Sequence, residues 1–260
     1  MTHGLDGNGL ILKMRQPFLD KLKVHIDERR LKLIEPFVYS IDHKLNVARY
    51  SAGLIRAVEP RDYNKHYTKR DQKTSTKKHT KVEYSKRCIY YAYDWDQYSL
   101  ELLFFVESFA AAAISLFDTS GHLLTDMYNL SLRPEEADFH KATKEIQIKA
   151  PRLYSFLANF IVDDPTCSEW FKRLKKLRNS ITHREVTQIL MLGTPYPPHQ
   201  QQILLLKNAI SAPDNLVVHE FIEQCFNGLE EYVEGLYDRL ARQVDAERSL
   251  PLTGRHDHLI

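Results

Sequence analysis

Glycine and cysteine are both scarce in this sequence, and each shortage narrows the possible folds. Only 9 of the 260 residues are glycine, which argues against a β-rich fold with many tight turns. The three cysteines, Cys88, Cys167 and Cys225, lie far apart and form no CxxC or Cys/His spacing. Neither a zinc site nor a disulfide framework is therefore expected. We predict a cytoplasmic protein that needs neither a metal ion nor a cofactor.

Long apolar runs are also missing. The most apolar stretch, from Leu102 to Phe117, is shorter than the roughly 20 residues needed to span a bilayer and contains Glu107. The N-terminus has no basic segment followed by an apolar run and a small-residue cleavage site. We interpret the apolar stretch as a buried core helix and predict no membrane span.

Charge of one sign is not in excess over the whole chain. The formal net charge is only +2, so any affinity for nucleic acid must come from local patterning. Residues 61–87 show the clearest local excess, with ten Lys and Arg against Asp62, Asp71 and Glu83. We expect this segment to be a basic, mobile excursion, for which a solvated loop is favoured over an RNA-contacting arm.

Apolar residues recur at helical spacing over most of the chain. The first expected helix covers residues 16–57, with a break or kink at Pro36, and the second covers residues 96–117. Gly121 is expected to interrupt the second helix, and a shorter helix follows it to about Leu132. Three more helices are expected over residues 134–161, with a kink at Pro151, over 164–185 and over 217–245. Residues 188–192 and 202–206 flank a Pro-rich turn and suit a small hairpin, and residues 90–93 suit one strand. Residues 1–14 and 249–260 are expected to be a loose leader and a disordered tail.

These elements predict an all-α protein. We expect one domain over residues 1–260, in which five or six helices pack around a single core and the hairpin is an insertion. The last helix has a continuous apolar stripe for this core, formed by Phe221, Cys225, Leu229, Tyr232, Val233, Leu236 and Leu240.

The segment from Asp164 to Glu185 carries the candidate site. Thr166 and Glu169 have the spacing of a capping box, which predicts a helix start. On a helical wheel, an apolar stripe that must be buried is formed by Trp170, Leu174, Leu177 and Ile181. The opposite face is basic and holds Lys172, Lys175, Lys176, Asn179 and His183, with Arg178 at the edge of the apolar stripe.

The run Arg178-Asn179-Ser180-Ile181-Thr182-His183 resembles the Arg-polar-x3-His motif of the HEPN superfamily. Many members are helical-bundle, metal-independent endoribonucleases, often toxins or defence proteins, whose motifs meet across a homodimer cleft. The resemblance implies that Arg178 stabilises charge on the scissile phosphate, that His183 is the general acid/base and that Asn179 orients the site. It further implies attack by the ribose 2′-hydroxyl, RNA as the substrate, and an antitoxin or other inhibitor protein as a candidate partner.

The residue types suit this chemistry. Histidine titrates near neutral pH, and arginine stays charged and meets phosphate oxygens with a planar fork. Lys172, Lys175, Lys176 and Arg184 are candidates for contacts with the RNA backbone. Residues five apart lie about 140° apart on an ideal helix, so Arg178 and His183 would approach one phosphate from flanking sides, near a fraying helix end or with help from a second protomer.

Similar motif spacings occur twice elsewhere. Arg61-Asp62-x3-His66 lies in the basic excursion, where no apolar stripe fixes its geometry. Arg133-x6-His140, a looser match, straddles Pro134 at a helix start. We therefore favour the motif at Arg178.

Two other interpretations remain open. The chain could be a non-catalytic HEPN-like module that binds RNA, a nucleotide or a partner protein, with Arg178 paired to a neighbouring carboxylate. It could also be a helical interaction protein that binds through residues 61–87.

Overall fold

The computed structural model describes the backbone of residues 8–57, 88–91, 97–182, 189–193, 201–205 and 216–246, and the side chains of 15–57, 101–182 and 216–244. The chain divides into two compact units. The first comprises Met1–His43, Leu116–Ile161 and Leu229–Ile260, and the second comprises Lys44–Ser115 and Val162–Gly228. The long helices α2 (Glu28–Ala57), α5 (Gln97–Tyr128) and α10 (Val218–Ala246) contribute residues to both units. That residues 1–260 form one domain stays a prediction, and the expected excursion at 61–87 and tail at 249–260 lie outside the described residues.

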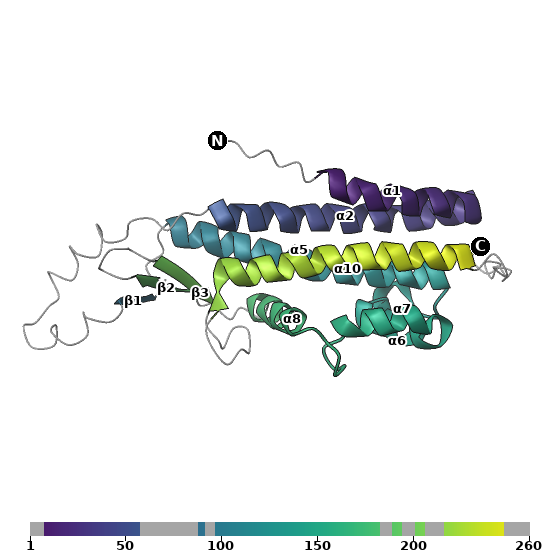
Figure 1. The fold of residues 1–260 in the computed structure, drawn as a ribbon. Helices are drawn as coiled ribbons and strands as arrows, with labels where there is room; N and C mark the ends of the chain where they lie inside the picture. The colour runs from purple at the N-terminus through teal and green to yellow at the C-terminus, as the bar shows by residue number, and fades with distance from the viewer. Residues whose placement is uncertain are drawn as a thin grey trace, which may run out of the picture. The chain divides into compact units, whose positions relative to one another are not determined.

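The all-α helical bundle expected from the sequence is confirmed. The described part of the chain contains seven α-helices (Figure 1), one or two more than expected. The first expected helix is divided into α1 (Asn8–His25) and α2, so residues 8–14 are helical rather than a loose leader. The division falls at Asp27, whose Oδ1 accepts a hydrogen bond from the backbone N–H of Arg30 at 2.9 Å. Pro36 is exposed and lies inside α2, so a break there is excluded, while the alternative of a kink stays a prediction.

Gly121 does not interrupt α5, contrary to the expectation from the sequence. A Cβ at this position would lie 2.6 Å from the backbone nitrogen of Phe139 and 2.7 Å from the carbonyl carbon of Asp138. The missing side chain therefore lets the start of the next helix, α6 (Phe139–Lys149), approach α5 closely.

The C-terminus of α5 is capped by two basic side chains. Asn129, directly after the helix, has a φ of 46°, the left-handed conformation typical of a helix end. Nη2 of Arg30 donates to the carbonyl oxygens of Asp126 and Met127, at 3.2 and 2.8 Å. Nζ of Lys149 donates to those of Tyr128 and Asn129, at 2.9 and 3.0 Å. These bonds satisfy carbonyls that the helix leaves unpaired and place positive charge at the negative end of its dipole.

The helix expected from residue 134 to about 161 is divided into shorter pieces. A 3₁₀ turn, η1 (Pro134–Glu136), precedes α6, and α7 (Pro151–Leu157) and η2 (Ala158–Phe160) follow it. Asp138 starts α6 because its side chain accepts from the backbone N–H of Lys141 at 2.8 Å.

The core of the first unit is aromatic. The ring of Phe117 on α5 lies 5.2 Å from Phe139 of α6, 5.5 Å from Phe160 and 4.3 Å from Tyr232 of α10, measured between centroids. All seven residues of the apolar stripe predicted for α10 are buried. The prediction of that helix was correct to one residue at each end.

Among the described side chains of the first unit, one charged group is buried. Asp42 of α2 is 2% exposed. Its Oδ2 accepts from Nη1 of Arg15 at 3.0 Å, and its Oδ1 lies 3.1 Å from the hydroxyl of Tyr237, which donates to it. Burial raises the pKa of Asp42, although the bonds to Tyr237 and Arg15 act in the opposite direction.

The second unit contains a small antiparallel sheet. Its strands are β1 (Cys88–Tyr91), β2 (Ile189–Gly193), β3 (Gln201–Leu205) and β4 (Leu216–Val217), in that spatial order. The expected hairpin is confirmed by β2 and β3, in which Ile189 pairs with Leu205. β1 extends it along one edge, with Cys88 opposite Gly193, so the strand expected near residue 90 is also present.

The apolar stretch of α5 meets the length and hydropathy of a membrane span. Residues Glu101–Tyr128 are long and apolar enough by composition, but half of the most apolar window is buried within the protein. Leu102, Val106 and Phe109 are at most 1% exposed, as expected for a core helix. The absence of a membrane span stays a prediction.

Candidate functional site

Helix α8 (Glu169–Thr182) carries the described part of the candidate motif and belongs to the second unit. Asp164 forms the turn before it, since its Oδ1 accepts from the backbone N–H of Thr166 at 2.9 Å and from the hydroxyl of Thr166 at 2.6 Å. The carbonyl oxygen of Ser168 accepts the first helical bond, from Phe171 at 3.1 Å. The predicted capping box was wrong, because the Thr166 hydroxyl bonds Asp164 and the helix begins three residues later.

The buried side of α8 differs slightly from the predicted stripe. Leu174 and Leu177 are fully buried as expected. The flanking positions are filled by Phe171 and Ser180, both at 3% exposure, while Trp170 and Ile181 are only half-buried. The buried face is therefore turned by about one residue from that drawn on the wheel.

The other side of α8 is basic. Lys172 and Lys175 are half-buried and Lys176 is exposed. None of the three makes an ion pair within the described residues, whereas Arg173 is paired with Glu169 at 3.2 Å. Burial raises the pKa of the Cys167 thiol, and the charges of Lys172 and Lys175 oppose that rise, which places both lysines near the start of the helix. The three lysines leave positive charge available for an anionic ligand.

Two motif residues are linked directly. Nη1 of Arg178 donates to Oδ1 of Asn179 at 3.3 Å, and both side chains are half-buried. The hydroxyl of Thr182 donates to the carbonyl oxygen of Arg178 at 2.9 Å. Arg178 makes no ion pair with any carboxylate in the described part of the chain. His183 and Arg184 lie just outside the described residues.

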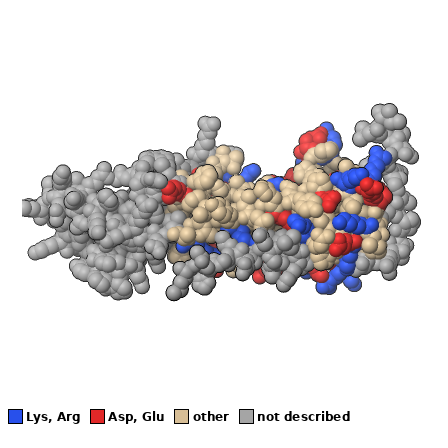
Figure 2. Space-filling view, turned by 90° about the horizontal axis from the view of Figure 1, so that it is seen from above, with Lys and Arg blue, Asp and Glu red and all other residues tan. Residues whose placement is uncertain are grey.

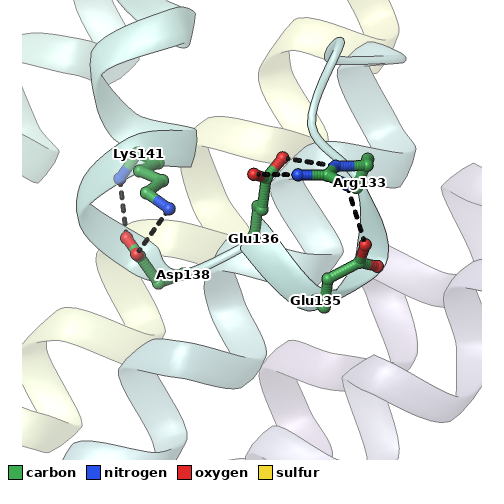
Figure 3. Close-up of polar contacts among 5 residues, drawn as sticks. All are labelled: Arg133, Glu135, Glu136, Asp138 and Lys141. Atoms are coloured by element: carbon green, nitrogen blue, oxygen red, sulfur yellow. Dashed lines mark hydrogen bonds and ion pairs between the residues drawn. The ribbon is translucent and has the colours of Figure 1, made fainter.

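The second motif-like pair has a different environment. Nε and Nη2 of Arg133 donate to the two carboxylate oxygens of Glu136, at 3.0 and 2.6 Å, and Nη1 lies 3.6 Å from Glu135 (Figure 3). The bond to Glu136 raises the pKa of Arg133 and lowers that of Glu136. The guanidinium of Arg133 is thus already bound by a carboxylate, whereas the looser motif would need it to bind a phosphate. Arg61 and His66 lie outside the described residues.

The surface over α1 and the first part of α2 is electrically mixed. Viewed toward α1 and the first part of α2, basic and acidic side chains are interleaved (Figure 2). Nζ of Lys32, for example, lies 2.7 Å from a carboxylate oxygen of Glu28. Such interleaving gives phosphate no region of one sign, in contrast to the face of α8.

Sequence reasoning missed how α8 is seated on α10. The indole of Trp170 lies against Gly228, where an added Cβ would be 2.4 Å from the ring. The signal was present, because a glycine inside an otherwise apolar helical pattern often marks a close approach. Among the described residues, no group of three or more His, Cys, Asp or Glu side chains is arranged to hold a metal ion.

A family model described as Cthe2314-like HEPN matches residues 63–245, well over half of the chain. The chain belongs to the HEPN family. The HEPN match includes α5, α6, α7, α8 and nearly all of α10, and leaves α1 and α2 outside. No curated protein and no solved structure matches the chain. The resemblance inferred from Arg178 onward is thereby confirmed at the level of the family, which associates this chain with nuclease-like or RNA-related modules.

Proposed function

We propose that this HEPN protein is a metal-independent endoribonuclease whose site is Arg178, Asn179 and His183. The observation that carries the proposal is that the family match contains α8, where Arg178 and Asn179 open the Arg-polar-x3-His motif. The half-buried Arg178 bonds only a neutral amide among the described side chains, so its charge remains available to a phosphate.

RNA supplies its own nucleophile in this reaction. The 2′-hydroxyl loses its proton and its oxygen bonds the adjacent phosphorus, while the bond from phosphorus to the 5′-oxygen breaks and that oxygen takes up a proton. The products are a 2′,3′-cyclic phosphate and a 5′-hydroxyl. His183 is assigned the proton transfers, Arg178 the charge on the phosphate oxygens, and Asn179 the orientation of Arg178.

The remaining assignments follow from the same site. Lys172, Lys175, Lys176 and Arg184 would contact the RNA backbone, and a homodimer would bring a second motif to the phosphate. A role as a toxin or defence protein in the cytoplasm, restrained by an antitoxin or other inhibitor, completes the proposal.

A non-catalytic HEPN module that binds RNA is the second candidate. The unpaired lysines of α8 support RNA binding whether or not the motif cleaves. A module that binds a nucleotide or a partner protein belongs to the same alternative. The absence of a described carboxylate beside Arg178 favours the catalytic assignment over a purely structural one.

The deciding experiment is RNA cleavage in EDTA by the wild type, Arg178→Ala and His183→Ala, with analysis of the product ends. We expect 2′,3′-cyclic ends from the wild type and a loss of at least about 100-fold in each variant. The matched control is Arg133→Ala with His140→Ala, which removes the other motif-like pair and should keep wild-type activity. Equal cleavage by all proteins, or none by the wild type, would reject the catalytic assignment and leave the binding module.

A further inference from the structure

We propose that Trp170 and Gly228 are positioning residues that fix where α8 sits along α10, and thereby where Arg178 and Asn179 are held. The consequence for catalysis rests on the proposed function. The seating of α8 itself can be tested independently of any activity.

The indole ring of Trp170 packs directly on the backbone of α10 at Gly228, which has no side chain. A Cβ added at Gly228 would lie 2.4, 2.5 and 2.8 Å from Cε2, Cζ2 and Nε1 of Trp170. Ordinary contacts of a Cβ begin at 3.4 Å, so any side chain at Gly228 would force the indole back by about 1 Å. Gly228 is buried, and one turn earlier the Sγ of Cys225 lies 4.0 Å from the carbonyl oxygen of Trp170.

The contact between Trp170 and Gly228 can fix the position of α8 along α10, which the other contacts of α8 cannot do. Leu174 and Leu177 are fully buried and hold α8 against its neighbours, but apolar burial is not directional. A large ring that fits only where α10 lacks a side chain specifies one position along the helix. The ring plane of Phe171 meets that of Trp170 at 86°, with the centroids 5.9 Å apart, which restricts the indole further.

The contact is well placed to act on the motif. Arg178 follows Trp170 by eight residues on one continuous helix, about 12 Å along its axis. An α-helix is stiff over this length, so a displacement of about 1 Å at Trp170 reaches Arg178 and Asn179 largely undiminished. A misplacement of that size can cost about 100-fold in rate. The lysines of α8 would be displaced as well, but a lysine ammonium on its flexible stem can still reach a phosphate, so RNA binding should suffer less than the chemical step.

The test is Gly228→Ala, alone and combined with Trp170→Leu, which shortens the side chain that meets the new methyl group. We expect Gly228→Ala to lower kcat by about 10- to 100-fold with KM changed less than about 3-fold, and the double variant to recover part of that loss. Hydrogen exchange followed by mass spectrometry should show weaker amide protection in residues 174–182 of Gly228→Ala, restored in the double variant.

The matched control is Gly235→Ala, also on α10. Its Cβ would lie 2.6 Å from Cζ of Phe156, so it introduces a similar clash with α7 rather than with α8. It should leave the exchange of residues 174–182 and the ratio of kcat to KM unchanged.

Two results would overturn the proposal: wild-type exchange in Gly228→Ala, or no recovery of exchange in the double variant. If Gly228→Ala does not fold, Trp170→Phe tests the contact from the other helix, and unchanged exchange of α8 there would overturn the proposal equally. If the wild type cleaves no RNA, the proposed function fails, while the exchange measurements still decide whether this contact seats α8.

Discussion

Arg178 and Arg133 are each followed by a histidine at a motif-like spacing, yet their partners differ in charge. Arg133 is bound by both oxygens of Glu136, and a bidentate carboxylate satisfies the same fork that would hold a phosphate. Arg178 is bound by the neutral amide of Asn179. A neutral acceptor orients the guanidinium and leaves its charge available, so the identity of residue 179 matters electrostatically.

Asn179→Asp tests this distinction with an almost isosteric change. The new carboxylate would pair with Arg178 and compete with the phosphate, so we expect kcat/KM for RNA cleavage to fall by about 100-fold, or about 2.7 kcal/mol of transition-state stabilisation. Asn46→Asp on the exposed face of α2 adds the same charge and should have little effect. Equal activity of Asn179→Asp and the wild type would show that Asn179 does not act through Arg178.

The buried carboxyl of Asp42 makes a second prediction at this scale. Its pKa is raised in the folded protein, chiefly by burial, from an ordinary value of 3.8. The folded state therefore holds this proton more tightly than the unfolded chain does. The stabilisation linked to the proton is complete below pH 3.8 and is lost as the pH rises through the higher folded pKa.

Asp42→Asn removes this titration. We expect the free energy of unfolding of the wild type, relative to that of Asp42→Asn, to decrease as the pH is raised from about 3.5 to about 7. Urea unfolding curves of both proteins across this range give the difference directly. A difference that stays constant or increases with pH would contradict the raised pKa.

At the scale of single elements, the end of α5 depends on side chains from two other helices. Arg30 of α2 and Lys149 of α6 donate to four consecutive carbonyls, three at the end of α5 and that of Asn129 directly after it. Each hydrogen bond replaces water at a group that the helix cannot pair, and each cation faces the negative end of the dipole. The two side chains therefore fasten α2 and α6 to the same helix end.

Replacing either cap by methionine keeps the aliphatic stem and removes the donor. We expect Arg30→Met and Lys149→Met each to lower the free energy of unfolding by about 1 kcal/mol. Lys144→Met is the matched control, because Lys144 is exposed and pairs with no described residue, and it should be neutral. Thermal or urea unfolding measures all three, and caps as neutral as the control would contradict this account of the helix end.

Apolar periodicity was sufficient to predict most of the long elements. The spacing of Phe221, Leu229 and Leu240 predicted α10 to within one residue at each end, and the β-like runs around the Pro-rich turn predicted the hairpin. Boundaries set by tertiary contacts could not be found in this way. In the sequence Gly121 resembles a helix breaker, but in the fold it lies inside α5 and lets the backbone of Phe139 approach.

Polar side chains caused the other errors in the fold and the site. The helix break at Asp27 depends on which of several acidic residues accepts a backbone bond, and Thr166 bonds Asp164 instead of capping α8. At the site, the sequence predicted a basic helix carrying the motif, but not the bond between Arg178 and Asn179. A spacing shows which residues share a helix face, whereas a hydrogen bond depends on rotamers that only the fold selects.

At the scale of the whole molecule, a net charge of +2 gives little long-range attraction for RNA. Affinity must then come from local cations, and Lys172, Lys175 and Lys176 of α8 make no ion pair in the described chain. The segment 61–87, which lies outside the described residues, is a second basic region. The salt dependence of RNA affinity can separate the contribution of α8 from that of residues 61–87, because each contact with a phosphate releases a fixed share of counterion.

We expect combined replacement of Lys172, Lys175 and Lys176 by glutamine to lower the slope of log affinity against log salt by about 2 for single-stranded RNA, at about 0.7 for each lost contact. Fluorescence anisotropy at several salt concentrations measures the slope. Deletion of residues 61–87 is the comparison. If that deletion abolishes the slope and the lysine variant does not change it, the basic segment rather than α8 binds RNA.

The small sheet has a consequence for how the chain is made. Cys88 of β1 pairs with Gly193 of β2, and α5 to α8 lie between them in the sequence. At about 5 to 20 residues per second, a ribosome finishes β1 roughly 5 to 20 seconds before its partner strand emerges, whereas helices form in about a microsecond. The nascent chain would therefore carry Ile89, Tyr90 and Tyr91 with unpaired backbone groups throughout that interval. Synthesis, rather than the finished protein, is the period in which this strand is most exposed to pairing with other chains.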